Sequence, residues 1–425
     1  MVNNNLKNKG DFNIMAKEIK MHVFDSKFAE SDSNFNSLSI VDDYIYYTLC
    51  THDIDFPGKA YRLKIGTNTP ELVGDLGVIC GETDVKRIPQ GKSHTPFYKY
   101  NGKIWFATHC SFYGGATPDG KENPAPPPEG YLGYAGGRIV SIDENGKTEV
   151  VAKSPEGEGI ITLTMDTDRG ICYCLTWPSA LLLIYNVNTN ELINAGKVAL
   201  DGEIGAGDRY SCICRIFAVE PTTGLAYFTL SNGEIYETDA KGNVKLVDWC
   251  NLKRPVFGEW DPTKGGHQGY NWRYLVYNKT YKKFYGIQPK TGHLYSFDPV
   301  NKEFKIIRRI ASQVCIEKGC YEDFRYGYMT LAKAPSNDDM LYYVSGYTAE
   351  DGTARLTAVS YSISKDEYKD HGVIVLPNGD YPKNIQTLAV ADNGEWYCCP
   401  WIKTDKLTPK GETFYASDLA KFTVE

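Results

Sequence analysis

Short apolar strands separated by polar turns recur along the whole chain. Each unit has an apolar strand, a turn, and a second strand in which aromatic residues stand side by side. Alternation with a period near two residues, bounded by Gly, Asn and Asp, is typical of β-hairpins. Seven second strands are recognisable, at 44–50, 103–109, 171–177, 225–231, 283–288, 341–346 and 395–400.

Two further strands follow in several units, as in GGRIVSIDENGKTEVVA and GEIYETDAKGNVKLVD. Four strands per unit in seven copies predict an all-β, seven-bladed β-propeller. We expect one domain over 1–425, with 1–17 as an N-terminal extension and with segments 18–25 and 413–424 completing the closing blade. A long β-sandwich or a β-solenoid is the alternative architecture.

The composition is typical of a protein rich in strands and turns, and it argues against some classes of binding partner. The chain of 425 residues has 40 Gly, 31 Tyr and 13% aromatic residues. With 42% hydrophobic and 23% charged residues it is neither disordered nor a coiled coil. No apolar run approaches the roughly 18 residues that span a bilayer. A net charge of −7 argues against nucleic acid or an anionic membrane as partner. The oligomeric state is left open.

The number and spacing of the cysteines indicate the cellular compartment in which the protein resides. The twelve Cys include no CxxC pair, and several lie in apolar, strand-like runs. Such residues are typical of a reduced protein in which free Cys packs as a small hydrophobe. The segment MVNNNLKNKGDFNIMAKEIK has no apolar stretch of the kind found in signal peptides. We therefore expect a cytoplasmic protein, or a secreted or periplasmic one if the sequence is a mature form.

Two of the seven His stand out by their register. His94 and His109 flank the turn Asn101-Gly102, and a two-residue turn that pairs Tyr100 with Lys103 also places His94 opposite His109. Their Cβ atoms would then be about 5 Å apart on one sheet face. The other six second strands have Cys50, Trp177, Ser231, Gln288, Gly346 and Pro400 at this position. Paired imidazoles suit metal binding or general acid and base catalysis, whereas a structural pair is the alternative.

Arginine and aromatic residues supply a second component of the candidate site. Arg215, Arg273 and Arg325 stand at or near the start of the first strand in three consecutive units. Together they would form a cationic ring suited to carboxylates, although each could be a salt-bridged scaffold residue. Aromatic residues near the predicted strand ends and in the long insertion 110–136 would stack on sugar rings, or belong to the core: Tyr113, Tyr134, Trp177, Tyr210 and Tyr270.

Several ordered blocks resemble a known family. GKSHTPF, KIWFATHCSFYGG, PPPEGYLGYAGGRIVSID, GEGIITLTMDTDRGICYCLTWPS and CRIFAVEPTTGLAYFTLSNGEIYETD together are similar to the seven-bladed β-propeller polysaccharide lyases. The closest group is the ulvan lyases and the related rhamnosyl-glucuronate lyases. The resemblance implies cleavage at C4 of a uronic acid by β-elimination, with two His from one blade, a Tyr, and an Arg against the uronate carboxylate.

Only some of the family's active-site residues have a clear counterpart in this sequence. The two His correspond to His94 and His109. After TWPS this chain continues as ALLLIY, where the family usually has Gly-His and a basic residue. We therefore assign the Tyr to Tyr134 and the Arg to Arg215 as substitutes, with Arg138 and Arg273 as further choices for the Arg.

Elimination at a uronate requires neutralisation of its carboxylate and a base that works near neutral pH. His94 and His109 would serve as base and carboxylate partner, with Tyr134 or another tyrosine as acid. The sugar-binding set would be Tyr113, Trp177, Tyr210, Tyr270, Arg273 and Arg325. We expect a lyase acting on a uronate-containing oligo- or polysaccharide, without a required cofactor. The resemblance allows a structural zinc or calcium ion, for which no ligands are assignable. A propeller glycoside hydrolase on rhamnose–glucuronate linkages and a non-catalytic carbohydrate-binding or interaction propeller are the rivals.

Overall fold

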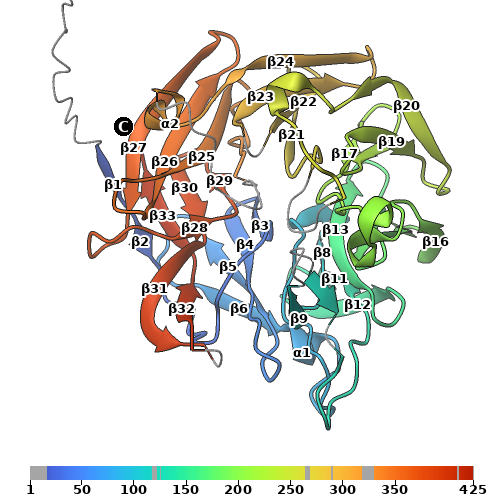
Figure 1. Ribbon diagram of the computed structural model, residues 1–425. Helices are drawn as coiled ribbons and strands as arrows, with labels where there is room; N and C mark the ends of the chain where they lie inside the picture. Colours follow the sequence, from blue (N-terminus) through green and yellow to red (C-terminus); the bar gives the residue numbers. More distant parts are fainter. Residues whose placement is uncertain are drawn as a thin grey trace, which may run out of the picture.

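The computed structural model describes residues 17–116, 122–124, 126–263, 269–288, 291–317, 330–408 and 411–424. In these ranges seven four-stranded sheets stand in a ring, which Figure 1 shows with each sheet as one sector. The predicted seven-bladed β-propeller is therefore confirmed. The expected extension over 1–17 lies outside the described ranges except for residue 17. No helix in the described part is long and apolar enough to cross a bilayer.

The first five blades each take their four strands in chain order, and only blade two has a further hairpin inserted between its second and third strands. Blade one consists of β3 (Leu38–Val41), β4 (Tyr44–Leu49), β5 (Lys59–Lys64) and β6 (Glu71–Asp75), and blade two of β7 (Tyr98–Tyr100), β8 (Lys103–Ala107), β11 (Arg138–Ile142) and β12 (Thr148–Lys153). Blade three consists of β13 (Gly159–Asp166), β14 (Ile171–Trp177), β15 (Leu181–Asn186) and β16 (Glu191–Lys197). Blade four consists of β17 (Ala218–Val219), β18 (Ala226–Thr229), β19 (Glu234–Thr238) and β20 (Val244–Asn251), and blade five of β21 (Leu275–Asn278), β22 (Lys283–Ile287), β23 (His293–Asp298) and β24 (Glu303–Arg309).

The last two blades share the N-terminal segment. Blade six has β25 (Met340–Thr348), β26 (Ala354–Ser362) and β27 (Glu367–Val375), with β1 (Glu18–Lys20) added in parallel at its outer edge. Blade seven has β29 (Ala389–Val390), β30 (Glu395–Cys398) and β33 (Ala420–Thr423), with β2 (His22–Val23) paired antiparallel to β33. The ring thus closes by strands from both ends of the chain, and radial repetition leaves only short sheet edges.

The predicted closing segments need one correction. Only the last part of segment 413–424 enters blade seven, as β33. Its first part is β32 (Thr413–Ser417), which pairs with β31 (Pro400–Leu407), and β31 pairs with β28 (Asn384–Ile385) in a separate three-stranded sheet. Blade two carries the other addition, a hairpin of β9 (Tyr113–Ala116) and β10 (Glu122–Pro124). The remaining short elements are α1 (Leu76–Ile79), α2 (Gln313–Glu317), η1 (Gly202–Ile204), η2 (Gly207–Arg209) and η3 (Pro255–Phe257).

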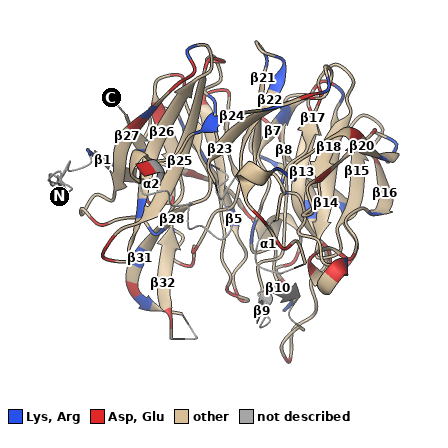
Figure 2. Cartoon of the chain, turned by 45° about the horizontal axis from the view of Figure 1, so that its top comes forward, with Lys and Arg blue, Asp and Glu red and all other residues tan. Residues whose placement is uncertain are grey.

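Side chains of adjacent blades form the core. Between blades three and four, Tyr173 packs against Phe217, and Phe217 packs against Phe228. The paired aromatic residues of the second strands therefore bury large apolar areas between sheets, which is the main stabilising term. Charged residues lie mainly on the turns and outer edges of the blades, as Figure 2 shows.

The ten cysteines that the structure describes are all free, and nine of them are buried. This agrees with the expected reduced core. Burial raises the pKa of thiols such as that of Cys172, to about 12, and such thiols stay protonated and unreactive near neutral pH.

The inner strands enclose a cavity of about 790 Å³ at the propeller axis. Residues in or next to the inner strands of the blades line it, among them Ile40, Tyr98, Thr164, Phe217, Val276, Lys333 and Leu388. This cavity lies toward the hairpin turns, and its lining includes neither His94 nor His109. The candidate site lies at the opposite ends of the inner strands.

Candidate active site

The two imidazoles of blade two are neighbours in space. Asn101 and Gly102 both have a positive φ, of 48° and 72°, as a type I′ turn requires. Their turn sets the expected register next to it, with Tyr100 opposite Lys103. The ring centroids of His94 and His109 are 5.1 Å apart at an interplanar angle of 82°. The predicted proximity is confirmed.

The exact pairing differs from the prediction. The backbone of His109 pairs with Lys92, in an isolated bridge two residues out of the hairpin register. Between this bridge and β7 the first strand leaves the ladder, and the Thr95 hydroxyl takes the place of a backbone acceptor for the amide of Ala107 (2.9 Å). A local irregularity of this kind changes the direction in which side chains project. His94 therefore contacts His109 from a diagonal position and not from the directly opposite one.

Both imidazoles are removed from water. His94 is 7% exposed and His109 is 0% exposed. Neither ring nitrogen of His94 has a hydrogen-bond partner among the described residues. His109 fits because position 159 is Gly, since a Cβ there would lie 1.9 Å from its Nδ1. Burial and the nearby Lys92 hold the pKa of both groups well below the ordinary value, so both are neutral near pH 7.

The pair belongs to an aromatic arc that we define by five rings from three blades and from the small three-stranded sheet. Phe35, which precedes β3, stacks on His94 with centroids 4.7 Å apart and planes 9° apart. Trp401 of β31 meets Phe35 edge-on at 6.3 Å. At the other end Trp177 meets His109 edge-on at 5.6 Å. The arc therefore joins the small three-stranded sheet to blades one, two and three.

Three cationic side chains act electrostatically on the arc. Lys92 is 3% exposed, and its Nζ lies 4.8 Å from the centroid of Phe35. Lys92, Arg215 and Arg273 all act electrostatically on His94, Lys92 most strongly after burial itself. Lys92 is a residue that the sequence prediction omitted. Its spacing of two from His94, which favours one face of a strand, was the available signal.

Arg215 has a partner within the protein. Its guanidinium is 2.8 Å from Glu203 of η1 in a buried ion pair. The Glu203 carboxylate also accepts hydrogen bonds from the indole of Trp177 (3.1 Å) and the amide of Ile213 (3.0 Å). Burial acts to raise the pKa of Glu203, but these contacts outweigh it and the pKa is lowered. Glu203 therefore orients Arg215 and holds Trp177 against His109.

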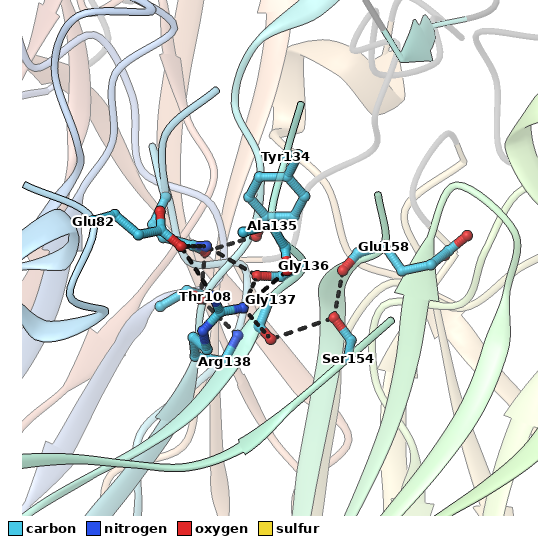
Figure 3. Close-up of polar contacts among 10 residues, drawn as sticks. Glu82, Thr108, Tyr134, Ala135, Gly136, Gly137, Arg138, Ser154 and Glu158 are labelled. Atoms are coloured by element: carbon cyan, nitrogen blue, oxygen red, sulfur yellow. Dashed lines mark hydrogen bonds and ion pairs between the residues drawn. The ribbon is translucent and has the colours of Figure 1, made fainter. Parts of the chain in front are cut away.

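Tyr134 is held in a separate hydrogen-bonded network (Figure 3). Its hydroxyl donates to the side chain of Gln90 (2.7 Å), which also accepts from Thr108 (2.7 Å). Arg138 binds Glu82 at 3.0 Å and donates to three backbone carbonyls, so it is part of the scaffold of this insertion. Burial raises the pKa of Tyr134 well above its ordinary value. This geometry favours a structural role for both side chains, and the acid role of Tyr134 stays a prediction.

The remaining predicted residues are only partly brought together. Trp177 and Tyr134 line a cavity of about 250 Å³ with Cys110 and Phe112. Tyr270 donates to the carbonyl of Gly258, and Tyr210 is buried at the end of η2. Arg325 and the side chain of Tyr113 lie outside the described part of the chain. No group of three or more His, Cys, Asp or Glu that could hold a metal occurs in the part described.

Comparison with known proteins gives only distant likenesses. No protein-family model matches the chain, and no curated protein does. An oligogalacturonate lyase of Vibrio parahaemolyticus is similar in structure, with 9% identity, a TM-score of 0.49, and coverage of 93% of this chain and 90% of that one. U3-55K is similar with 8% identity, a TM-score of 0.48 and coverage of 95% and 98%. The fold assignment rests on the sheet topology described above.

The buried imidazoles make stability depend on pH. In the unfolded chain they bind protons near pH 6.5, whereas the folded protein excludes those protons to a lower pH. We expect the free energy of unfolding to fall on acidification through this range, by up to about 1.4 kcal/mol per pH unit per His. Urea titrations from about pH 8 to about pH 5 would measure it. A His94→Gln/His109→Gln variant should show a shallower dependence, and an identical slope would contradict the assignment.

Proposed function

We propose that this protein is a lyase that cleaves a glycosidic bond at C4 of a uronic acid by β-elimination. The observation that carries the proposal is a pair of neutral, buried imidazoles beside the ammonium group of Lys92. An unprotonated imidazole is a competent base near neutral pH, and a buried cation stabilises the negative charge of an enolate.

The neutralising role falls to Lys92 in this proposal, with Arg273 as second cation. Arg215 is less suited to it than the sequence implied, because Glu203 already balances its charge. Lys92 is the strongest electrostatic influence on both imidazoles, so a carboxylate bound to it would lie next to them. The proposed site would thus bind the substrate carboxylate at Lys92 and hold the neighbouring C–H bond next to the imidazoles.

His94 is the proposed base because neither of its ring nitrogens is engaged. It takes the proton from C5, the C–H electron pair forms the C4=C5 double bond, and the bond between C4 and the leaving oxygen breaks. The same proton then passes from His94 to the leaving oxygen, so that no other reactant is consumed. Substrate reaches His94 when the half-buried ring of Phe35, now stacked on it, moves aside.

Ultraviolet absorbance tests this proposal directly, because the product carries a double bond conjugated to its carboxylate. We expect absorbance to rise with at least one of ulvan, rhamnosyl-glucuronate, glycosaminoglycan or pectic oligosaccharides. Saturated sugar released without absorbance would indicate the rival hydrolase. Binding without any product would indicate a carbohydrate-binding propeller. Either result would contradict the elimination proposal.

A further inference from the structure

The cavity of about 790 Å³ at the propeller axis is separate from the imidazole pair. Its volume falls in the range of about 300–1,000 Å³ that is usual for sites of small molecules. None of the five rings of the aromatic arc lines it, and neither does Lys92. It lies toward the hairpin turns, whereas the imidazoles lie at the opposite ends of the inner strands. A molecule bound here would therefore leave His94 uncovered.

Two tyrosines line this cavity from opposite sides of the ring. Tyr98 of β7 belongs to blade two, and Tyr274, just before β21, belongs to blade five, three blades further round a ring of seven. After burial itself, Tyr274 is the strongest influence that raises the pKa of Tyr98, so the two hydroxyls lie within electrostatic range of each other. Phe217 of blade four also lines the wall. Aromatic rings pack well on one another, so this part of the cavity suits a flat aromatic ring.

The hydroxyl of Tyr274 is open to a ligand. Burial alone raises its pKa to about 12, and no residue that the structure describes forms a hydrogen bond with it. Protein atoms nonetheless cover the side chain only in part, because it borders the cavity. The Tyr98 hydroxyl, by contrast, already interacts with Thr164. Since native proteins pair nearly all polar groups that are removed from bulk water, a hydroxyl on the ligand is the partner that Tyr274 lacks.

The turn between β21 and β22 adds positive charge at the mouth of the cavity. Lys279 and Lys282 of this turn line the cavity, are exposed, and form no ion pair with a described residue. Against them stands one unpaired lining carboxylate, that of Asp168 on the turn of blade three. The chain as a whole has a net charge of −7, so this excess of ammonium groups is local. Neighbouring lysines of this kind attract a carboxylate.

The other charged lining residues are already balanced within the protein. The carboxylate of Asp166 is 2.9 Å from the guanidinium of Arg169. The ammonium group of Lys333 is 2.8 Å from the carboxylate of Asp338. Neither pair therefore adds net charge to the cavity, and the unpaired lysines decide its preference for an anion.

We propose that the axial cavity binds a hydroxylated aromatic acid, with its acidic group at Lys279 and Lys282 and its hydroxyl at Tyr274. A strand rises by about 3.4 Å per residue, so the turn begins about 14 Å from Tyr274. The lysine side chains shorten that gap to the length of two fused rings. The proposal goes beyond the lyase activity and does not depend on it, because neither imidazole nor Lys92 lines the cavity.

Calorimetry with three probes tests each contact separately. 6-Hydroxy-2-naphthoate carries both groups, 2-naphthoate lacks the hydroxyl, and 2-naphthol lacks the acid. We expect one hydroxynaphthoate to bind per chain. Lys279→Gln/Lys282→Gln should weaken both acids about tenfold, lower the salt dependence of their binding, and leave naphthol within about twofold. Tyr274→Phe should weaken the two hydroxylated probes roughly three- to tenfold and leave 2-naphthoate unchanged.

Lys302→Gln/Lys305→Gln is the matched control. Lys302 stands on the outer turn of the same blade with φ 54°, the value that Lys282 has on the inner turn. Lys305 lies on β24, both side chains are exposed, and neither lines the cavity. This variant should bind all three probes with the affinity of the wild-type protein. Matching melting temperatures would show that the variants are folded.

The outcomes separate this site from the proposed lyase site. No binding of hydroxynaphthoate at millimolar concentration would overturn the proposal, and so would equal affinity in Lys279→Gln/Lys282→Gln and the wild-type protein. Loss of binding in Lys92→Gln would place the acid beside the imidazoles and would overturn it too. Because these titrations involve no sugar, a failure of the elimination assay leaves their result intact.

Discussion

Replacement of His94 by alanine is expected to lower kcat/KM for elimination by about 10²–10⁴-fold, the range typical of a lost general base. Replacement of His109 is expected to cause a loss of similar order, because His109 packs against His94 at 5.1 Å and fills the space over Gly159. Initial rates of the absorbance increase, on whichever oligosaccharide is cleaved, would measure both effects.

His371→Ala is the matched control. His371 shares a hydrogen bond with the hydroxyl of Ser360 in blade six, which contributes no ring to the aromatic arc. Its replacement should leave kcat/KM within about twofold, since a surface-proximal change away from the site has little effect. Full activity of His94→Ala would show that His94 is not the base, and loss of activity in all three variants would point to general instability instead.

The ion pair between Glu203 and Arg215 should dominate the stability of the site. Removing one member of a buried pair leaves the other charge unpaired, and we expect Glu203→Ala to lower the free energy of unfolding by about 3–5 kcal/mol. The indole of Trp177 and the amide of Ile213 also lose their acceptor in this variant. Urea denaturation monitored by Trp fluorescence would measure the loss.

A double-mutant cycle separates the ion pair from the other contacts of Glu203. Because Glu203→Ala and Arg215→Ala each break the same pair, the double variant should lose clearly less than the sum of the two. Glu71→Ala supplies the control, since it breaks the half-exposed pair with Arg62 and should cost only about 0–1 kcal/mol. Additive losses in the cycle would contradict the coupling inferred here.

Local pattern was sufficient to predict the blades. Alternation of apolar and polar residues sets which side chains face the neighbouring sheets, and Gly, Asn and Asp set the turns, so both depend on residues close in the sequence. The turn Asn101-Gly102 is the clearest example, because it forms the hairpin whose two arms lead to His94 and His109. Even there the register changed beyond Tyr98, where the Thr95 hydroxyl replaces a backbone partner.

The sequence by itself determined the seven-bladed ring, the free and buried cysteines of the described chain, and the neighbouring imidazoles. Only the tertiary structure decided what surrounds those imidazoles. Phe35, Lys92 and Trp401 approach them from segments far apart in the chain, and Glu203 takes Arg215 out of the set of candidate carboxylate ligands. The physical reason is that turns and alternation act within one hairpin, whereas the site forms between blades, where packing and charge pairing select the contacts.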